Sequence, residues 1–252
     1  MKTTLILLFS LFMSAHLQSQ NGTYLEYKIS SGTGHGGSIK MNASEYGSLS
    51  EFSMVIPQMP GGGMITKSLI QKSHPGIIYS INDKNKSYSE ITPSEASGQD
   101  SKTYSVKKLG SETVNGYKCV HALITEGTET HEVWNTKDFA DYSKYSEVFA
   151  ATKKMGSAKR DQALKDAGCE GLPVKMVHKG NKQEGDMTME LVKLEKRTYA
   201  KADFEIPAGF TKSASSGSSV GGVKSQQELM NMTPEERAKY IEEMKKQYGG
   251  GK

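Results

Sequence analysis

Apolar and polar residues alternate along most of the chain between residues 23 and 91, which is the period of β-strands that bury one face. In the first segment Leu25, Tyr27 and Ile29 share one face, and charged residues occupy the positions between them. The same pattern predicts a second strand that begins with Ile39 and Met41. It also predicts strands at 51–56, 64–71, 76–81 and 86–91. A polar run of Asn and Asp at 82–85 is typical of a hairpin turn. This part of the chain is therefore predicted to be an antiparallel meander.

The remaining pattern keeps strands but interrupts them with helices. After a polar loop at 92–102, strands are predicted at 104–109, 116–125, 129–135, 173–178 and 187–195, with 204–207 as a candidate edge strand. Helix-like composition covers 138–151 and 157–167, with Asp138 and Ser157 as candidate caps and Gly168 as a stop. The pattern predicts a mainly β (α+β) fold with a helical insertion at 138–167.

The two ends of the chain differ from this domain. Lys2 followed by an apolar run at 5–13 predicts a secretory signal over residues 1–20. That run is shorter than the roughly 20 apolar residues that span a membrane, and it is not followed by a cysteine for lipid attachment. We expect a soluble protein in the periplasm or the medium, without a transmembrane anchor, whose β-rich domain covers 21–210.

Composition shifts to Ser and Gly after residue 210, which predicts a flexible linker at 211–232. A Thr-Pro-Glu-Glu start then predicts a C-terminal helix at 233–248. Its apolar stripe is narrow. The helix is thus either a docking element for the domain or an envelope partner, or a solvated helix.

Charge and cysteine content narrow the classes of function. The formal net charge is +4, and the basic residues are spread along the chain, so no nucleic-acid footprint is expected. The only two cysteines, Cys119 and Cys169, form a disulfide most simply in an oxidising compartment, and two buried free thiols are the alternative.

Recognisable catalytic motifs are absent from the sequence. The glycines at 61–63 lack the lysine and helix of a phosphate-binding loop, and no nucleophile elbow occurs. The histidines lie on separate predicted strands and turns; His121 and His131 are the pair that could face each other across a hairpin in a zinc or copper site. We expect no enzyme, no cofactor and no metal.

Methionine is the informative residue type, because its flexible side chain suits an irregular core or a cavity for varied acyl chains. Of these two interpretations, packing in the core is the simpler one. Copper binding by the thioethers is a third interpretation. The methionines in question lie on or at the ends of predicted strands: Met41, Met54, Met59, Met64, Met176, Met187 and Met189.

Several stretches resemble a family of exported bacterial proteins, the domain of unknown function 4412. They are YSVKKLG at 104–110, ETVNGYKC at 112–119, EVWNTKD at 132–138, GLPVKM at 171–176 and FEIPAGF at 204–210. The resemblance covers about residues 23–210, and its motifs are structural, so it implies no active-site residues.

The order of meander, helical insertion and returning strands is also similar to periplasmic lipoprotein carriers of the LolA and LolB type. That similarity implies a curved antiparallel sheet, or unclosed β-barrel, around a hydrophobic cavity, with 138–167 as a lid. The residues it would place along the cavity are Leu25, Tyr27, Ile39, Met54, Trp134, Met176 and Met189.

The leading hypothesis is a non-catalytic binding protein that holds a lipid or another apolar molecule by hydrophobic burial. A structural or interaction protein with a filled core is the alternative, and an unrecognised hydrolase or metal-binding protein ranks third. A packed or a hollow concave face would distinguish the first two.

Overall fold

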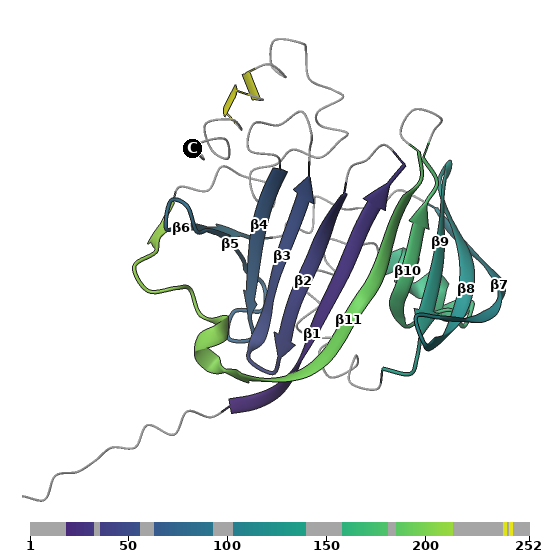
Figure 1. The fold of residues 1–252 in the computed structure, drawn as a ribbon, viewed down its shortest axis with the longest axis horizontal. Coiled ribbons are helices and arrows are strands. Elements are labelled where there is room, and N and C mark those ends of the chain that lie inside the picture. Colours follow the sequence, from purple (N-terminus) through teal and green to yellow (C-terminus); the bar gives the residue numbers. More distant parts are fainter. Residues whose placement is uncertain are drawn as a thin grey trace, which may run out of the picture.

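The computed structural model contains one curved, unclosed sheet of twelve strands (Figure 1). It describes residues 19–32, 36–55, 63–92, 103–139, 158–180 and 185–213, together with Lys239, Tyr240, Glu242 and Glu243. The strands are β1 Ser19–Ser31, β2 Gly36–Ser44, β3 Gly47–Val55, β4 Gly63–Gln71, β5 Ile78–Asn82, β6 Ser87–Ile91, β7 Tyr104–Val114, β8 Tyr117–Glu126, β9 Glu129–Thr136, β10 Leu172–His178, β11 Met187–Ala200 and β12 Thr211–Lys212. The helical elements are α2 Ala158–Asp166 and the 3₁₀ turn η3 Lys201–Phe204.

The sheet consists of two meanders joined by one long-range pair. Its strand order is β12-β6-β5-β4-β3-β2-β1-β11-β10-β9-β8-β7. All neighbouring strands are antiparallel except β12 and β6, which are parallel. Strand β1 pairs with β11 from Ser19–Ala200 to Ser31–Met187, so the start of the domain closes against its end. The predicted mainly β fold with a curved, unclosed antiparallel sheet is confirmed.

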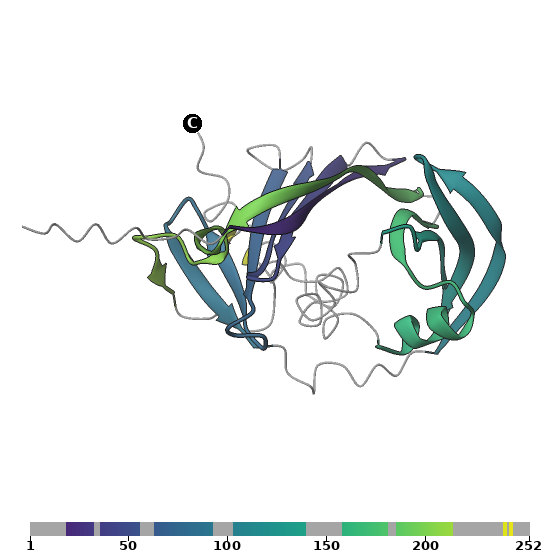
Figure 2. The ribbon, with the colours of Figure 1, turned by 90° about the horizontal axis from the view of Figure 1, so that it is seen from below.

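Three irregularities in the strand register accompany the curvature of the sheet. They lie opposite Glu26 and Tyr27 in the β1–β11 pair, at Pro173–Lys175 in β10 and at Lys108–Gly110 in β7. Bulges of this kind bend a strand and increase its twist. Figure 2 shows the result: the sheet arches from β6 over β1 and β11 to β7, and α2 lies inside the arch.

Helix α2 lies within the predicted helix at 157–167 and ends at the predicted stop. Gly168 has φ +65°. Its N–H donates to the carbonyl of Lys165 at 2.9 Å, and the N–H of Cys169 donates to that of Leu164 at 2.8 Å. These two bonds form the Schellman pattern that satisfies the last helical carbonyls. Of the predicted helix at 138–151, only Asp138 and Phe139 are described, and neither is helical.

The predicted edge strand at 204–207 is wrong. The chain forms η3 there, and the N–H of Ala200 donates to Asp203 Oδ2 at 2.8 Å. Phe204 is 2% exposed and packs against Leu69 and Tyr199, so burial of its ring holds the segment across the sheet rather than along its edge. Thr211 and Lys212, at the start of the predicted linker, form the edge strand β12 instead.

The predicted segments at the two ends lie largely outside the described residues. This holds for residues 1–18 of the signal, for the linker after residue 213 and for most of the helix at 233–248. Strand β1 begins at Ser19, inside the span assigned to the signal. The four described residues near the C-terminus, Lys239, Tyr240, Glu242 and Glu243, are helical. Within the described ranges, no helix is long and apolar enough to cross a membrane.

The predicted disulfide is also wrong, because Cys119 and Cys169 are both buried free thiols. Cys169 packs with Ala122 and Ile124 of β8, whereas Cys119 lies three residues before Ala122 and so faces the other side of that strand. A strand therefore separates the two sulfur atoms. Burial raises the pKa of both thiols, which keeps them protonated and unreactive.

Candidate functional site on the concave face

The inner side of the arch is identified by what packs against α2. Leu164 and Ala167, at the C-terminal end of this helix, join a cluster with Ala122 and Ile124 of β8 and Val133 of β9. Because α2 lies inside the arch (Figure 2), these strand residues mark the concave face. Directly paired residues on neighbouring strands share a face, so the register extends this assignment across the sheet.

By register, six of the seven residues predicted to bind a ligand lie on one face of the sheet. In the β9–β11 half, Val133 pairs with Met176, and Met176 pairs with Met189. Met189 pairs with Ile29 of β1, which alternates with Tyr27 and Leu25. The register thus connects the face next to α2 with the face that carries the N-terminal apolar residues.

The same face continues through β2 and β3. Tyr27 pairs with Ile39, and Gly37 pairs with Ile29 on one side and with Met54 on the other. Leu25 and Tyr27 are buried, whereas Ile39, Met54, Met176 and Met189 are only half-buried. A row of partly exposed apolar side chains therefore lines the inner side of the arch.

Trp134 lies on the other side of β9 from Val133, yet it packs in the same buried apolar cluster as Leu25 and Tyr27. It pairs with His121 and, across the bulge of β10, with Lys175. His121 stacks on the indole with ring centroids 4.1 Å apart, the Lys175 Nζ lies 5.3 Å from the ring centroid, and the indole N–H donates to Glu112. Its 9% exposure comes from these polar neighbours and from the apolar cluster, which also includes Leu172 of β10. Before Lys175, β10 does not pair with β11, and there the Trp134 side of β9 packs towards β1 and β11, while α2 covers the opposite side of β9.

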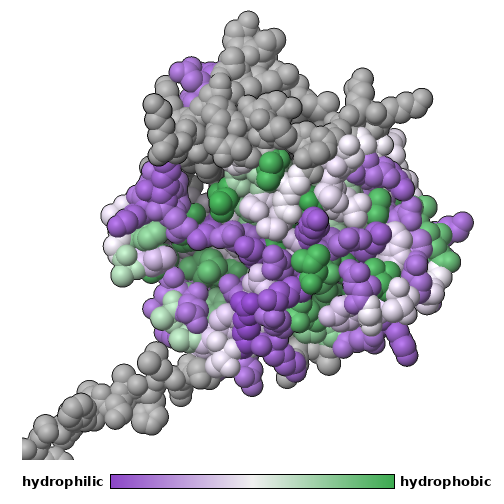
Figure 3. Space-filling view, viewed as in Figure 1, coloured by the Kyte–Doolittle hydropathy of each residue, from purple (hydrophilic) through white to green (hydrophobic). Residues whose placement is uncertain are grey.

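Charge is segregated completely between the two faces in β1–β4. All charged residues of these strands lie on the convex face, and four of them form one row of paired residues. From β1 to β4 the row consists of Glu26, Lys40, Glu51 and Lys67, so negative and positive charges alternate along it. Figure 3 views the convex face, where hydrophilic residues are prominent. The concave face of the same strands carries only uncharged residues.

Sequence reasoning missed part of the concave surface. Met41 pairs with Leu25, Phe52 pairs with Ile39, and Met64 pairs with Met54. Phe52 and Met54 are separated by one serine, so their alternation was present in the sequence. The sequence did not show which face points inward, because alternation distinguishes the two sides of a strand without identifying the inner one.

A model of the family described as Domain of unknown function (DUF4412) matches residues 23–210. The chain belongs to the DUF4412 family. No curated protein matches it. The family description assigns no activity, so the geometry of this DUF4412 chain has to be interpreted on its own residues.

Several solved structures resemble the DUF4412 chain at low identity. A chain from the MucA/MucB complex of Pseudomonas aeruginosa is 13% identical with TM-score 0.38, over 75% of this chain and 56% of that one. An uncharacterized conserved protein from Thermus thermophilus is 8% identical with TM-score 0.43, over 77% and 91%. A putative outer membrane lipoprotein-sorting protein domain from Vibrio parahaemolyticus is 12% identical with TM-score 0.28, over 73% and 88%. The DUF4412 chain spans little more than half of the Pseudomonas chain.

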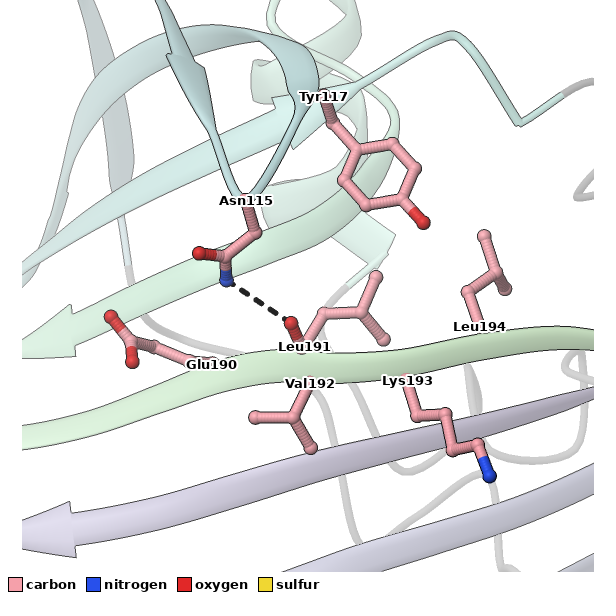
Figure 4. Close-up of a pocket in the computed structure, with 7 residues that line it drawn as sticks. All are labelled: Asn115, Tyr117, Glu190, Leu191, Val192, Lys193 and Leu194. Atoms are coloured by element: carbon pink, nitrogen blue, oxygen red, sulfur yellow. Dashed lines mark hydrogen bonds between the residues drawn. The ribbon is translucent and has the colours of Figure 1, made fainter.

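A pocket of about 350 Å³ lies where the β7–β8 hairpin tip meets β11 (Figure 4). Asn115 Nδ2 donates to the carbonyl oxygen of Leu191 at 3.1 Å, at a point where β10 no longer pairs with β11. Tyr117 and Leu194 add apolar surface, and Glu190 and Lys193 add charge. This pocket contains none of the predicted ligand-binding residues of the DUF4412 domain.

His121 and His131, the pair considered for a metal site, do not face each other, because the β8–β9 register places Trp134 opposite His121 and Ile124 opposite His131. His121 lies 3.0 Å from Glu132 and 3.4 Å from Glu112, on the same side of the sheet as Trp134. His131 instead faces His178 of β10. Within the described ranges, no three His, Cys, Asp or Glu side chains of the DUF4412 domain converge as metal ligands.

Proposed function

We propose that this DUF4412 protein is an exported binding protein that holds a lipid, or another molecule with an acyl chain, against its concave face without catalysing a reaction. The observation that carries the proposal is the segregation of charge in β1–β4: the inner face is uncharged and includes half-buried Ile39 and Met54, while the row that begins with Glu26 and Lys40 lies on the outer face.

The driving force is removal of apolar surface from water, at about 25 cal/mol per Å². The methionines suit this role because an unbranched, polarisable side chain adapts to an acyl chain of variable shape. Met54, Met176 and Met189 come from three different strands on the same face, so a bound chain that follows the sheet would contact several of them.

A structural role with a filled core is the second candidate, and one observation favours it. Helix α2 already covers the concave face at the β7–β9 end, where Ala122, Ile124 and Val133 are buried beneath it. If the rest of the face is covered in the same way, no ligand is needed.

The test compares two glutamate substitutions on opposite faces of adjacent strands. Met54→Glu places a carboxylate on the concave face, and Ile65→Glu is the matched control, because Ile65 follows Met64, the partner of Met54, and is 59% exposed on the convex face. We expect Met54→Glu to weaken binding of a fluorescent fatty acid at least about tenfold, which is about 1.4 kcal/mol, and Ile65→Glu to leave it unchanged.

Native mass spectrometry of the protein purified from its own envelope, followed by lipid extraction, gives a second measurement. A stoichiometric apolar species is expected. A bare mass, or equal loss of fatty-acid binding in both glutamate variants, would favour the structural role.

A further inference from the structure

Two histidines meet on neighbouring strands at one end of the concave face. His131 of β9 and His178 of β10 are directly paired, and their Nδ1 atoms lie 2.7 Å apart. Their ring centroids are 4.6 Å apart with an interplanar angle of 32°. Two imidazole nitrogens bound to one metal ion, each at about 2.0–2.1 Å, lie about 3.3–3.6 Å apart at tetrahedral or trigonal angles. The observed separation is a hydrogen-bond distance, so the two rings would have to move apart by less than about 1 Å to bind one ion.

A third donor continues the same row. Met187 of β11 pairs directly with His178, on the side away from His131. Paired residues on adjacent strands have Cβ atoms about 4.5–5.5 Å apart and share a face, which places the thioether within reach of an ion at the two rings. Met187 is 43% exposed although it is apolar. The row His131, His178, Met187 therefore offers two imidazoles and one sulfur from three successive strands.

The surroundings of His131 suit a metal ligand. His131 is half-buried and lies against His178. Its Nε2 is buried. Glu126 Oε2 lies 3.5 Å from this nitrogen, and the Tyr104 hydroxyl donates to Glu126 Oε1 at 3.3 Å. A carboxylate behind the second ring nitrogen is the usual orienting partner of a metal-bound histidine.

We propose that His131, His178 and Met187 bind one copper(I) ion at this end of the sheet. Thioether sulfur selects copper(I) over harder ions, and imidazole is a good ligand for copper. None of the three donors is among the residues proposed to contact the apolar ligand. A test of the copper site therefore does not test the proposed binding of an apolar ligand. The ion adds a second binding activity to the same domain.

The experiment is an anaerobic titration of the full chain with copper(I), in competition with a chromophoric copper(I) chelator. The variants are His178→Asn and Met187→Leu, and His74→Asn is the control, because His74 lies in the β4–β5 turn and contacts Ser73 and Gln71. Loss of a residue that hydrogen-bonds a metal ligand weakens metal binding about 10–100-fold. Because His178→Asn and Met187→Leu each remove a ligand itself, we expect copper(I) affinity to fall by at least this factor in both. The control should keep the affinity of the parent.

X-ray absorption of the loaded protein should show two nitrogen neighbours and one sulfur neighbour. Circular dichroism of each variant checks that the sheet is intact. The buried thiols of Cys119 and Cys169 are the competing copper ligands. Full affinity in His178→Asn, an absorption spectrum with sulfur ligands alone, or failure of the parent chain to bind one equivalent would each overturn the proposal.

Discussion

At the scale of single residues, Tyr24 combines burial with charged neighbours on the convex face. Its hydroxyl donates to Glu26 Oε2 at 2.8 Å, and the Arg197 guanidinium lies 3.7 Å from its ring centroid. Burial, followed by the hydrogen bond to Glu26, raises the pKa of Tyr24 to about 12. The phenolate is disfavoured because ionisation would remove the donated proton and place a second negative charge beside the carboxylate.

This shift predicts a loss of stability in strong alkali. Above pH 10 the unfolded chain releases the proton while the folded chain keeps it, so the free energy of unfolding falls until about pH 12. The slope is at most about 1.4 kcal/mol per pH unit. Tyr24→Phe should be less stable than the parent at pH 8, because the hydrogen bond is lost, and this difference should narrow between pH 10 and 12. Denaturant unfolding of both proteins at each pH measures it. A constant difference would contradict the pKa assignment.

At the scale of elements, turn chemistry decides where strands end. The β7–β8 hairpin turns at Asn115 and Gly116, whose φ angles are +50° and +83°. Asn-Gly with both residues at positive φ is the favoured two-residue hairpin turn. The turn directs Asn115 towards Leu191, so it also positions the hairpin tip over β11 (Figure 4).

Gly116→Ala should therefore destabilise the protein by about 1–2 kcal/mol, the cost of a side chain in the left-handed region. Gly110→Ala is the matched control. It lies on the same hairpin, its φ is outside the positive range, and an added Cβ would meet no atom within 4 Å. Thermal unfolding of both variants gives the comparison. Equal losses in stability would show that glycine flexibility in the bulge, rather than the turn, limits the hairpin.

The elements themselves were largely predictable, because period-two alternation is a local signal. Strands 64–71 and 129–135 were predicted within one or two residues of β4 and β9. The structure at 204–207 was not predictable, since burial of Phe204 depends on Leu69, which is distant in sequence. The side of β9 that carries Trp134 was not predictable either. Val133 and Trp134 are adjacent apolar residues, so the pattern does not decide which of them points inward.

At the scale of the whole molecule, the β1–β11 pair is the seam between the two meanders. Residues 19–31 pair with residues 187–200 along the full length of both strands. No local pattern specifies this pairing, which is why the sequence predicted the strands and not their order. The seam also makes one continuous concave face from two separate hairpin series, so the candidate site exists only when both halves are joined.

The seam predicts that the two halves unfold together. Leu25 lies in β1, pairs with Leu194 and is 3% exposed, so Leu25→Ala should cost about 2–5 kcal/mol. The single tryptophan, Trp134, lies in β9 of the other half and shares an apolar cluster with Leu25, while far-ultraviolet circular dichroism reports on the whole sheet. Both midpoints in denaturant should shift by the same amount, since coincident transitions are the mark of two-state unfolding.

The control is Val55→Ala, at a 53% exposed site in β3, which should leave both midpoints nearly unchanged. If the tryptophan midpoint stayed fixed while the circular dichroism midpoint moved, the halves would be independent and the shared concave face would not be a single site.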